Sequence, residues 1–301
     1  MESAGHECIG FCEIDKFARK SYKAIHDTKG EIELHDITRV TDESIRGFGS
    51  VDIICGGFPC QAFSIAGARR GFEDTRGTLF FEIARFASIL RPRYLFLENV
   101  KGLLNHENGI TFETIISTLD ELGYNVEWQV LNSKDFGVPQ NRERVFIIGH
   151  LRGECTRRVF PLSGQSQSIS SQSVVKIGNV NPSGNGMNGE VYQADGSAPT
   201  LSTMQGGGQE PKIIQRGHGY NKGGEHDIAP TLTSNSYQEN NHLSDGFRIR
   251  KLTPRECWRL QGFPDWAFDK AQEVNSNSQL YKQAGNSVTV NVIAAIAKEL
   301  S

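Results

Sequence analysis

Short apolar runs alternate with amphipathic stretches along the first half of the chain, residues 1–150. Such alternation predicts βα units, in which buried strands are separated by helices that cover a sheet. The apolar runs predict strands at Cys8–Cys12, Val51–Cys55, Tyr94–Leu97, Val126–Leu131 and Val145–Ile148. Helical spacing of apolar residues predicts helices at Thr78–Leu90 and Thr111–Leu122, the second ended by Gly123. We therefore expect an α/β domain with a doubly wound, mostly parallel sheet.

The pattern changes after His150. Residues 162–246 are rich in Ser, Gly, Gln and Asn and show little helical periodicity. A segment of this composition cannot build a large core alone. It nevertheless contains an internal echo, Ala198–Leu201 and Ala229–Leu232, which argues against plain disorder.

Regular structure is expected to return near Arg248, and Val288–Leu300 predicts a terminal helix with an Ala/Ile/Val face. The chain is thus expected to leave one domain, form a smaller and irregular second one, and come back. The three segments are 1–150, 151–247 and 248–301.

Composition narrows the class of protein. The 301 residues include 32 Lys and Arg against 35 Asp and Glu, for a net charge of −3, which argues against a general polyanion binder but leaves room for a local basic cleft. No apolar run approaches the length of a membrane span, and no secretory pattern opens the chain. We expect a soluble, cytoplasmic protein with no membrane partner.

The six cysteines form no CxxC pair and no evenly spaced framework, so disulfides are not expected. His6, Cys8 and Cys12 lie close in sequence, but their spacing matches no familiar zinc pattern and no second ligand pair follows. We therefore expect no metal, and interpret these thiols as small apolar side chains on a strand.

The sharpest local motif is Gly56-Gly57-Phe58-Pro59-Cys60-Gln61, which directly follows the predicted strand Val51–Cys55. In open α/β sheets, functional groups gather in the loops beyond the carboxyl ends of strands. The glycines permit close backbone approach, and Pro59 restricts the backbone beside the thiol. This position favours Cys60 as a nucleophile, while the spacing alone fits a buried loop cysteine equally well.

A second motif, Glu98-Asn99-Val100, ends the apolar run that begins at Tyr94. A partly desolvated carboxylate at the end of a strand can have a raised pKa and donate a proton near neutrality. The alternative is that Glu98 caps a helix or is a solvated loop acid.

A third motif, Gln140-Asn141-Arg142-Glu143-Arg144, precedes the last predicted strand of the first domain. Residues two apart on an extended segment face the same side, so Arg142 and Arg144 can grip a phosphate or a carbonyl oxygen together. Surface salt bridges with Glu143 are the alternative.

These three motifs, in this order, resemble the signature blocks of the cytosine-C5 DNA methyltransferases. Two later blocks fit as well, Arg250–Cys257 (RKLTPREC) and Gln283–Val288 (QAGNSV). The resemblance extends from about Cys8 to the C-terminus, and 151–247 is the variable part. It implies the α/β fold of S-adenosylmethionine-dependent methyltransferases, with 151–247 as a smaller target-recognition domain that reads double-stranded DNA.

The resemblance also implies roles for individual residues. Cytosine is shielded inside a duplex, so the enzyme must flip the base out of the stack. Cys60 would attack C6 as a thiolate, which makes C5 able to accept the methyl group of S-adenosylmethionine. Glu98 would contact N3 and the exocyclic amine, Arg144 would hold O2, and Arg142 would support the same pocket.

Two further groups of residues follow from the resemblance alone. The cofactor-binding group is Glu13, Ile14, Asp36, Ile37, Pro59, Leu79, Asn286 and Val288. The DNA-binding group is Gln61, Phe63, Ser64 and Arg69 in the catalytic loop, with the pairs Thr200-Leu201 and Thr231-Leu232 in the recognition segment.

One block of the family pattern, an aromatic residue followed by a glycine-rich turn of the form FxGxGG, has no counterpart in the sequence. Residues 1–6 resemble the end of the helix that follows that turn. In a doubly wound sheet the first strand is central, so its loss exposes the edges of two neighbours. We hypothesise that the chain is a truncated form of such an enzyme or the product of a decayed gene.

Other functions remain open from the sequence. One is a DNA-binding remnant that does not hold the cofactor. Another is a thiol hydrolase using Cys60, although the histidines that would assist it lie in or beside the variable segment: His150, His218, His226 and His242. A third is methylation of tRNA, against which the long polar segment argues. We expect a monomer that acts with a partner restriction endonuclease or in phage self-protection.

Overall fold

The computed structural model describes residues 1–59, 79–164 and 249–300, together with short strands in between. Those strands cover 176–179, 190–192, 212–215, 224–226, 229–230 and 241–244. All statements below concern these residues.

The centre of the molecule is a four-stranded sheet in the order β3-β4-β7-β5. Its strands are β3 (Ile53–Gly57), β4 (Tyr94–Val100), β5 (Tyr124–Asn132) and β7 (Glu143–Leu151). β3 pairs parallel with β4, whereas β7 pairs antiparallel with both β4 and β5. Three of the four strands therefore run in one direction, and β7 alone is reversed. The predicted α/β class is confirmed, with a mixed sheet.

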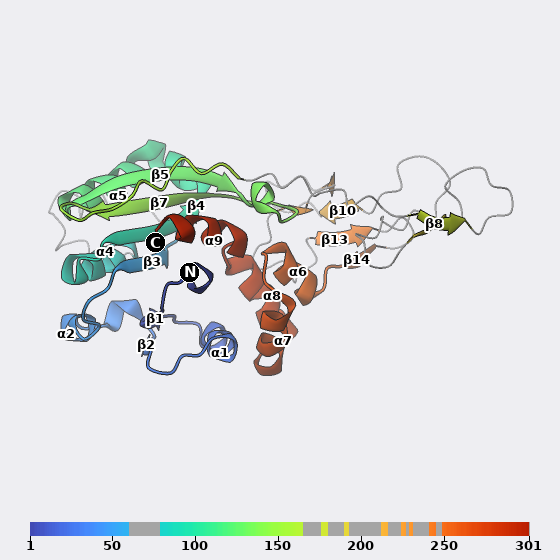
Figure 1. The fold of residues 1–301 in the computed structure, drawn as a ribbon, viewed down its shortest axis with the longest axis horizontal. Helices are drawn as coiled ribbons and strands as arrows, with labels where there is room; N and C mark the ends of the chain where they lie inside the picture. The colour runs from blue at the N-terminus through green and yellow to red at the C-terminus, as the bar shows by residue number, and fades with distance from the viewer. Residues whose placement is uncertain are drawn as a thin grey trace.

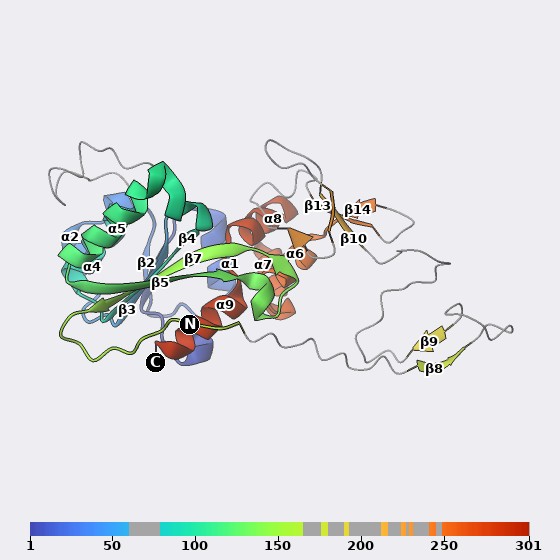
Figure 2. The ribbon, with the colours of Figure 1, turned by 90° about the horizontal axis from the view of Figure 1, so that it is seen from above.

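Helices cover both faces of this sheet (Figure 2). α4 (Leu79–Leu90) and α5 (Ile110–Glu121) pack on one face, and α9 (Val290–Glu299) packs on the other. The helices predicted at Thr78–Leu90, Thr111–Leu122 and Val288–Leu300 are thus confirmed, with small shifts at their ends.

Alternation along the central strands explains why their sequences are almost wholly apolar. In β4, Leu95 and Leu97 join the core beneath α4 and α5, while Tyr94 and Phe96 join the core beneath α9. Because successive side chains of a strand point to opposite faces, a strand covered on both sides must be apolar at nearly every position.

The N-terminal part forms a separate two-stranded sheet below β3 in Figure 1. β1 (Gly10–Cys12) pairs parallel with β2 (Ile32–Leu34), flanked by α1 (Lys16–Ile25) and α2 (Asp42–Arg46). The sequence pattern places Cys8–Cys12 in one sheet with the other predicted strands. Instead, within the described part of the chain, β1 pairs only with β2, and β3 only with β4.

Three C-terminal helices, which the sequence pattern did not predict, share a small core of their own. They are α6 (Pro254–Leu260), α7 (Asp265–Val274) and α8 (Asn277–Asn286). Thr253 and Glu256 cap the start of α6 reciprocally, with Pro254 at its first position. The block RKLTPREC is therefore a helix start.

Helix α8 connects this C-terminal unit to the N-terminal one. The ammonium of Lys282 lies 2.7 Å from the carboxylate of Asp15, and the hydroxyl of Ser21 donates to the side chain of Gln283 at 2.8 Å. In both ribbon views α6 and α8 lie between the central sheet and strands β10, β13 and β14 (Figures 1 and 2).

The described part of 176–251 consists of short strands. β10 (Lys212–Gln215), β11 (Gly224–His226), β13 (Asn241–Ser244) and β14 (Ile249–Lys251) form an antiparallel sheet. β8 (Lys176–Asn179) and β9 (Glu190–Tyr192) pair separately and antiparallel.

One copy of the internal echo contacts the first domain directly. Ala229–Pro230 forms β12, which pairs parallel with β6 (Gln140–Asn141) immediately before Arg142. The alanine of this pair is buried. The polar segment is thereby joined to the short strand that directly precedes Arg142.

Among the helices in the described ranges, none has the length and apolar character needed to cross a bilayer.

Truncating the fully buried Leu97 side chain tests the layered core. We expect Leu97→Ala to lower the free energy of unfolding by about 2–5 kcal/mol, because it removes buried apolar contacts and leaves a cavity. Urea denaturation followed by circular dichroism measures this change, with the exposed Ser117→Ala as a control that should shift it by less than about 0.5 kcal/mol. Equal effects of the two variants would contradict the proposed packing.

Candidate active site

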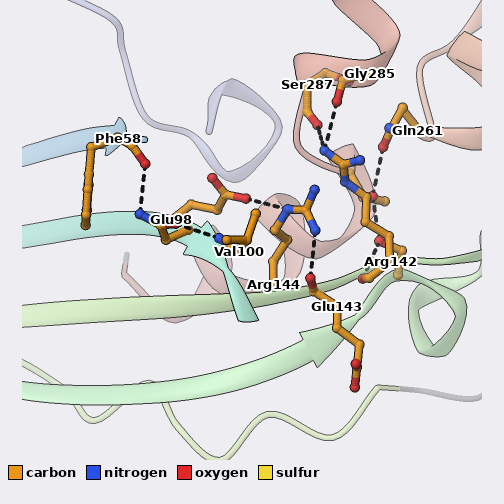
Figure 3. Close-up of polar contacts among 12 residues, drawn as sticks. Phe58, Glu98, Val100, Arg142, Glu143, Arg144, Gln261, Gly285 and Ser287 are labelled. Atoms are coloured by element: carbon orange, nitrogen blue, oxygen red, sulfur yellow. Dashed lines mark hydrogen bonds and ion pairs between the residues drawn. The ribbon is translucent and has the colours of Figure 1, made fainter. Parts of the chain in front are cut away.

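The candidate site lies where β3 and β4 end and β7 begins (Figure 3). The register places Gly57 of β3 opposite Glu98 of β4, and Val100 of β4 opposite Arg144 of β7. Because β7 is antiparallel, its first residues lie beside the last residues of β4. The second and third sequence motifs are therefore adjacent in space.

Glu98 and Arg144 form a largely buried ion pair. The Nε of Arg144 lies 3.0 Å from Oε1 of Glu98, and the side chains are 15% and 18% exposed. Burial raises the pKa of the Glu98 carboxyl, against the lowering effects of Arg144 and Arg142. Burial likewise lowers the pKa of Arg144, opposed by Glu98. Glu98 is thus neither a solvated acid nor a helix cap, since Val100 occupies the cap position of the next helix.

Gly57 provides the space that the Glu98 carboxylate occupies. A Cβ atom built on Gly57 would lie 3.2 Å from Oε2 of Glu98, closer than ordinary van der Waals contact. A larger residue would therefore displace the carboxylate, so the second glycine of the GGFPC motif has a steric role.

Arg142 points toward the turn that follows α8 (Figure 3). Its guanidinium donates to the carbonyl oxygens of Gly285 and Ser287, at 3.1 and 2.8 Å, and the residue is only 3% exposed. Burial lowers its pKa to about 10, with Arg144 adding a smaller lowering effect.

The two arginines were expected to grip one group together or to form surface salt bridges with Glu143. In the structure they bind different partners, because Arg142 reaches carbonyls at the C-terminal end of α8 while Arg144 reaches Glu98. The Glu143 carboxylate pairs instead with Lys101, at 2.9 Å.

A buried chain of hydrogen bonds holds the segment between α8 and α9. The hydroxyls of Ser133 and Thr289 lie 2.7 Å apart, and the Thr289 hydroxyl donates to the side-chain Oε1 of Gln261 at 3.1 Å. The side-chain Nε2 of Gln261 donates to the backbone carbonyl of Ala284 at 2.8 Å. Buried polar groups paired in this way order their surroundings, here the junction of β5, α6 and α8.

Asn99 is the site residue to which the sequence interpretation assigned no role. It is 2% exposed, its Nδ2 donates to the carbonyl of Phe58 at 2.8 Å, and its Oδ1 accepts from the amide of Val100 at 2.8 Å. A sequence signal was available, because Asn99 shares the inward face of β4 with Leu95 and Leu97. An amide at such a position needs buried partners.

The expected cofactor residues Glu13 and Asp36 follow the ends of the parallel strands β1 and β2. The amide of Glu13 donates to the carbonyl of Leu34 at 3.1 Å, which places the two strand ends side by side. Burial, together with the charges of Glu13 and Asp36, raises the pKa of Cys12, as expected for two carboxylates near one thiol. Beside Glu13, the apolar side chain of Ile14 is 71% exposed.

The remaining expected cofactor residues lie at several places. Ile37 packs against the core beneath α4, whereas Val288 packs against the core beneath α9. Pro59, Leu79 and Asn286 are exposed. The ion pair of Lys282 with Asp15 links the corner that holds Glu13 to the helix that ends at Asn286.

Other expected site residues lie outside the described residues. They are Cys60, Gln61, Phe63, Ser64, Arg69, Thr200, Leu201, Thr231 and Leu232. Among the described residues, no group of three or more His, Cys, Asp or Glu side chains is arranged to hold a metal ion.

Comparison with known sequences identifies relatives along the whole chain. The family described as C-5 cytosine-specific DNA methylase matches residues 1–301. The chain is 35% identical over 331 residues to the type II methyltransferase M.HhaI of Haemophilus parahaemolyticus, covering 99% of this chain and 88% of the relative. It is 32% identical over 407 residues to the orphan methyltransferase M.SPRI of Bacillus phage SPR, covering 98% and 92%.

Solved structures share the fold. The Dnmt2 methyltransferase of S. pombe superimposes with a TM-score of 0.59 at 20% identity, covering 99% of this chain and 92% of that one. The methyltransferase EhMeth of Entamoeba histolytica gives 0.58 at 18% identity, covering 96% and 88%.

The solved structures share the α/β fold of this chain, which holds a largely buried acid–arginine pair at the ends of its strands. The match over the whole chain is more specific: the protein belongs to the C-5 cytosine-specific DNA methylase family, whose members are DNA (cytosine-5-)-methyltransferases.

The raised pKa of Glu98 predicts a pH dependence of stability. A carboxyl whose pKa is higher in the folded state stabilises the fold fully below its unfolded pKa of about 4.3, and this contribution is lost as pH rises through the folded pKa. We therefore expect Glu98→Gln to gain stability relative to the original protein as pH rises from about 4.5 to 8. Denaturation across this range measures the difference, which should stay flat for Ser117→Ala. If the stability of Glu98→Gln relative to the original protein instead fell as pH rises, the pKa of Glu98 would be lowered in the folded state.

Gly57→Ala should displace the Glu98 carboxylate while the sheet stays intact, because the end of a side chain moves more easily than the backbone. We expect methyl transfer to fall about tenfold or more, with the melting temperature lowered by only a few degrees. Gly102→Ala is the matched control, since its added Cβ would meet nothing closer than 4.0 Å. Full activity of Gly57→Ala would show that the carboxylate position is unimportant.

Proposed function

We propose that this protein transfers a methyl group from S-adenosylmethionine to C5 of cytosine within a specific sequence of double-stranded DNA. The observation that carries the proposal is the buried Glu98–Arg144 pair beside the strand that leads to Cys60. Family membership defines the reaction class, and this pair supplies groups suited to one edge of a cytosine.

The chemistry of the pair matches the N3–C2–O2 edge of the base. N3 and O2 are attached to the same carbon, so an acid and a guanidinium held side by side can bind both at once. Burial raises the pKa of the Glu98 carboxyl, and in its protonated form this group can donate a hydrogen bond to N3. Arg144 remains charged and can donate to O2. Both contacts favour the electron flow into the ring that a nucleophile at C6 requires.

Cys60 is proposed as that nucleophile. Its thiolate would form a bond to C6, and the electron pair would move toward N3 and make C5 nucleophilic. C5 would then take the methyl group, lose its proton, and return the electron pair that breaks the sulfur–C6 bond. The thiolate is regenerated and the product is 5-methylcytosine.

The residues around Glu13 are suited to bind the nucleoside end of the proposed methyl donor. Glu13 and Asp36 present carboxylates suited to hydroxyl and amine groups, and the exposed Ile14 offers an apolar surface for an adenine ring. When bound, S-adenosylmethionine supplies the electrophilic methyl group. The sequence contains no FxGxGG turn, so the described residues account for the nucleoside end of the donor rather than its methionine end.

Residues 151–247 are proposed as the part that reads the target sequence. The pairing of β12 with β6 supports this assignment, because it connects that segment to the residues that directly precede Arg142 and β7. Polar loop side chains suit contacts to base edges and phosphates. The relatives include both type II enzymes of bacteria and orphan enzymes of phages, so a partner endonuclease and a self-protective role are both compatible with the proposal.

The direct test is transfer of labelled methyl groups from S-adenosylmethionine to mixed-sequence duplex DNA, with 5-methylcytosine mapped by sequencing. We expect the modified cytosines to share one short motif. Cys60→Ser should lower the rate by at least about 10³-fold, because no covalent adduct can form. Cys155→Ser, which changes an exposed cysteine away from the site, is the matched control and should retain full activity.

The outcomes separate the competing functions. DNA binding without saturable binding of S-adenosylmethionine would identify a DNA-binding remnant and contradict the proposal. Labelling of tRNA but not of duplex DNA would assign a different substrate. Equal activity of Cys60→Ser and Cys155→Ser would exclude the covalent route.

A further inference from the structure

The ladder between β3 and β4 ends at the pair Gly57–Glu98. Phe58, the residue after β3, is outside the sheet, so the ladder provides no backbone partner on β4 for its carbonyl. The side-chain amide of Asn99 takes this place and donates to the Phe58 carbonyl at 2.8 Å. A carboxamide has the same donor and acceptor groups as a peptide unit, so Asn99 extends the ladder by one hydrogen bond.

Phe58 is held at a second point by its ring. The ring is buried and lies 5.2 Å, centroid to centroid, from the ring of Phe80 in α4. The Phe58 carbonyl and the nitrogen of Pro59 belong to one planar peptide unit. Holding the carbonyl therefore sets the orientation of that plane, from which the restricted backbone of Pro59 continues to Cys60.

Asn99 is itself tightly held. Its Oδ1 accepts the amide of Val100, so both ends of its carboxamide are engaged in a buried setting. The preceding residue is Glu98, whose side chain points to the opposite face of β4. Two adjacent residues of β4 thus have different roles on its two faces. Glu98 provides the acid on one face, and Asn99 binds the Phe58 carbonyl on the other.

We propose that Asn99 is a positioning residue. By fixing the peptide unit between Phe58 and Pro59, which directly precedes Cys60, it sets the position of the nucleophile relative to Glu98. The inference rests on the proposed function, since it concerns how that reaction's groups are aligned. A purely structural role would instead affect stability without a selective effect on the chemical step.

Two variants remove the donor in different ways. Asn99→Asp keeps the shape and the acceptor for Val100 but places an oxygen against the Phe58 carbonyl. Asn99→Ser is uncharged and too short to reach that carbonyl. Tyr124→Phe is the matched control, because it deletes an equally buried side-chain hydrogen bond to a carbonyl, that of Pro92, elsewhere on the same core.

The first measurement is amide hydrogen exchange of the peptide covering Ile53–Phe58, without DNA or cofactor. We expect about tenfold faster exchange in both Asn99 variants, because the carboxyl end of β3 is released, and no change at this peptide in Tyr124→Phe. The second is steady-state methylation of duplex DNA. We expect kcat to fall about 10- to 100-fold, with KM for DNA changed less than about threefold.

The results distinguish this inference from the proposed function. Unchanged exchange at the end of β3, or a loss of kcat no greater than in Tyr124→Phe, would overturn the role of Asn99. A rise in KM with constant kcat would overturn it too, because misalignment of the nucleophile affects the chemical step. If the original protein transfers no methyl group, the proposed function fails and the exchange experiment alone decides the role of Asn99.

Discussion

The site depends on one interaction, the buried ion pair between Glu98 and Arg144. A charge removed from water is tolerated only when a partner compensates for its lost hydration. Displacing either side chain would therefore leave the other as a buried charge without compensation. Three features of the fold serve the pair. The reversed direction of β7 places Arg144 beside the end of β4, Gly57 leaves space for the carboxylate, and Asn99 holds the adjacent loop on the opposite face.

A second constraint links distant parts of the chain. Arg142 donates to the carbonyls on both sides of Asn286, at the C-terminal end of α8. The same helix is tied to the N-terminal unit by the ion pair of Lys282 with Asp15. The proposed base-binding side and the proposed cofactor side are therefore connected through α8, so a shift of this helix would move groups on both sides. This connection is made by polar contacts between segments more than a hundred residues apart.

Much of the fold was predictable because it follows from local periodicity. The five predicted strands and the helices around Phe86, Ile115 and Ile296 occur close to the expected ranges, since apolar repeats of two and of about 3.6 residues are visible in any short window. The helices α6 to α8 were missed, because they are short and polar and bury their apolar residues chiefly against one another. The split between β1–β2 and the central sheet agrees with the expectation that, without the FxGxGG block and its central strand, the edges of two neighbouring strands are left exposed.

The sequence by itself determined the family, the order of the motifs and the residue types at the site, because these are carried by runs of adjacent residues such as Glu98-Asn99-Val100. Only the tertiary structure decided which groups meet. Arg142 and Arg144 are only two residues apart, yet they bind different partners, because those partners come from the C-terminal end of α8 and from β4. Pairings of this kind, and the desolvation that raises the pKa of Glu98, arise only when strands distant in sequence pack together.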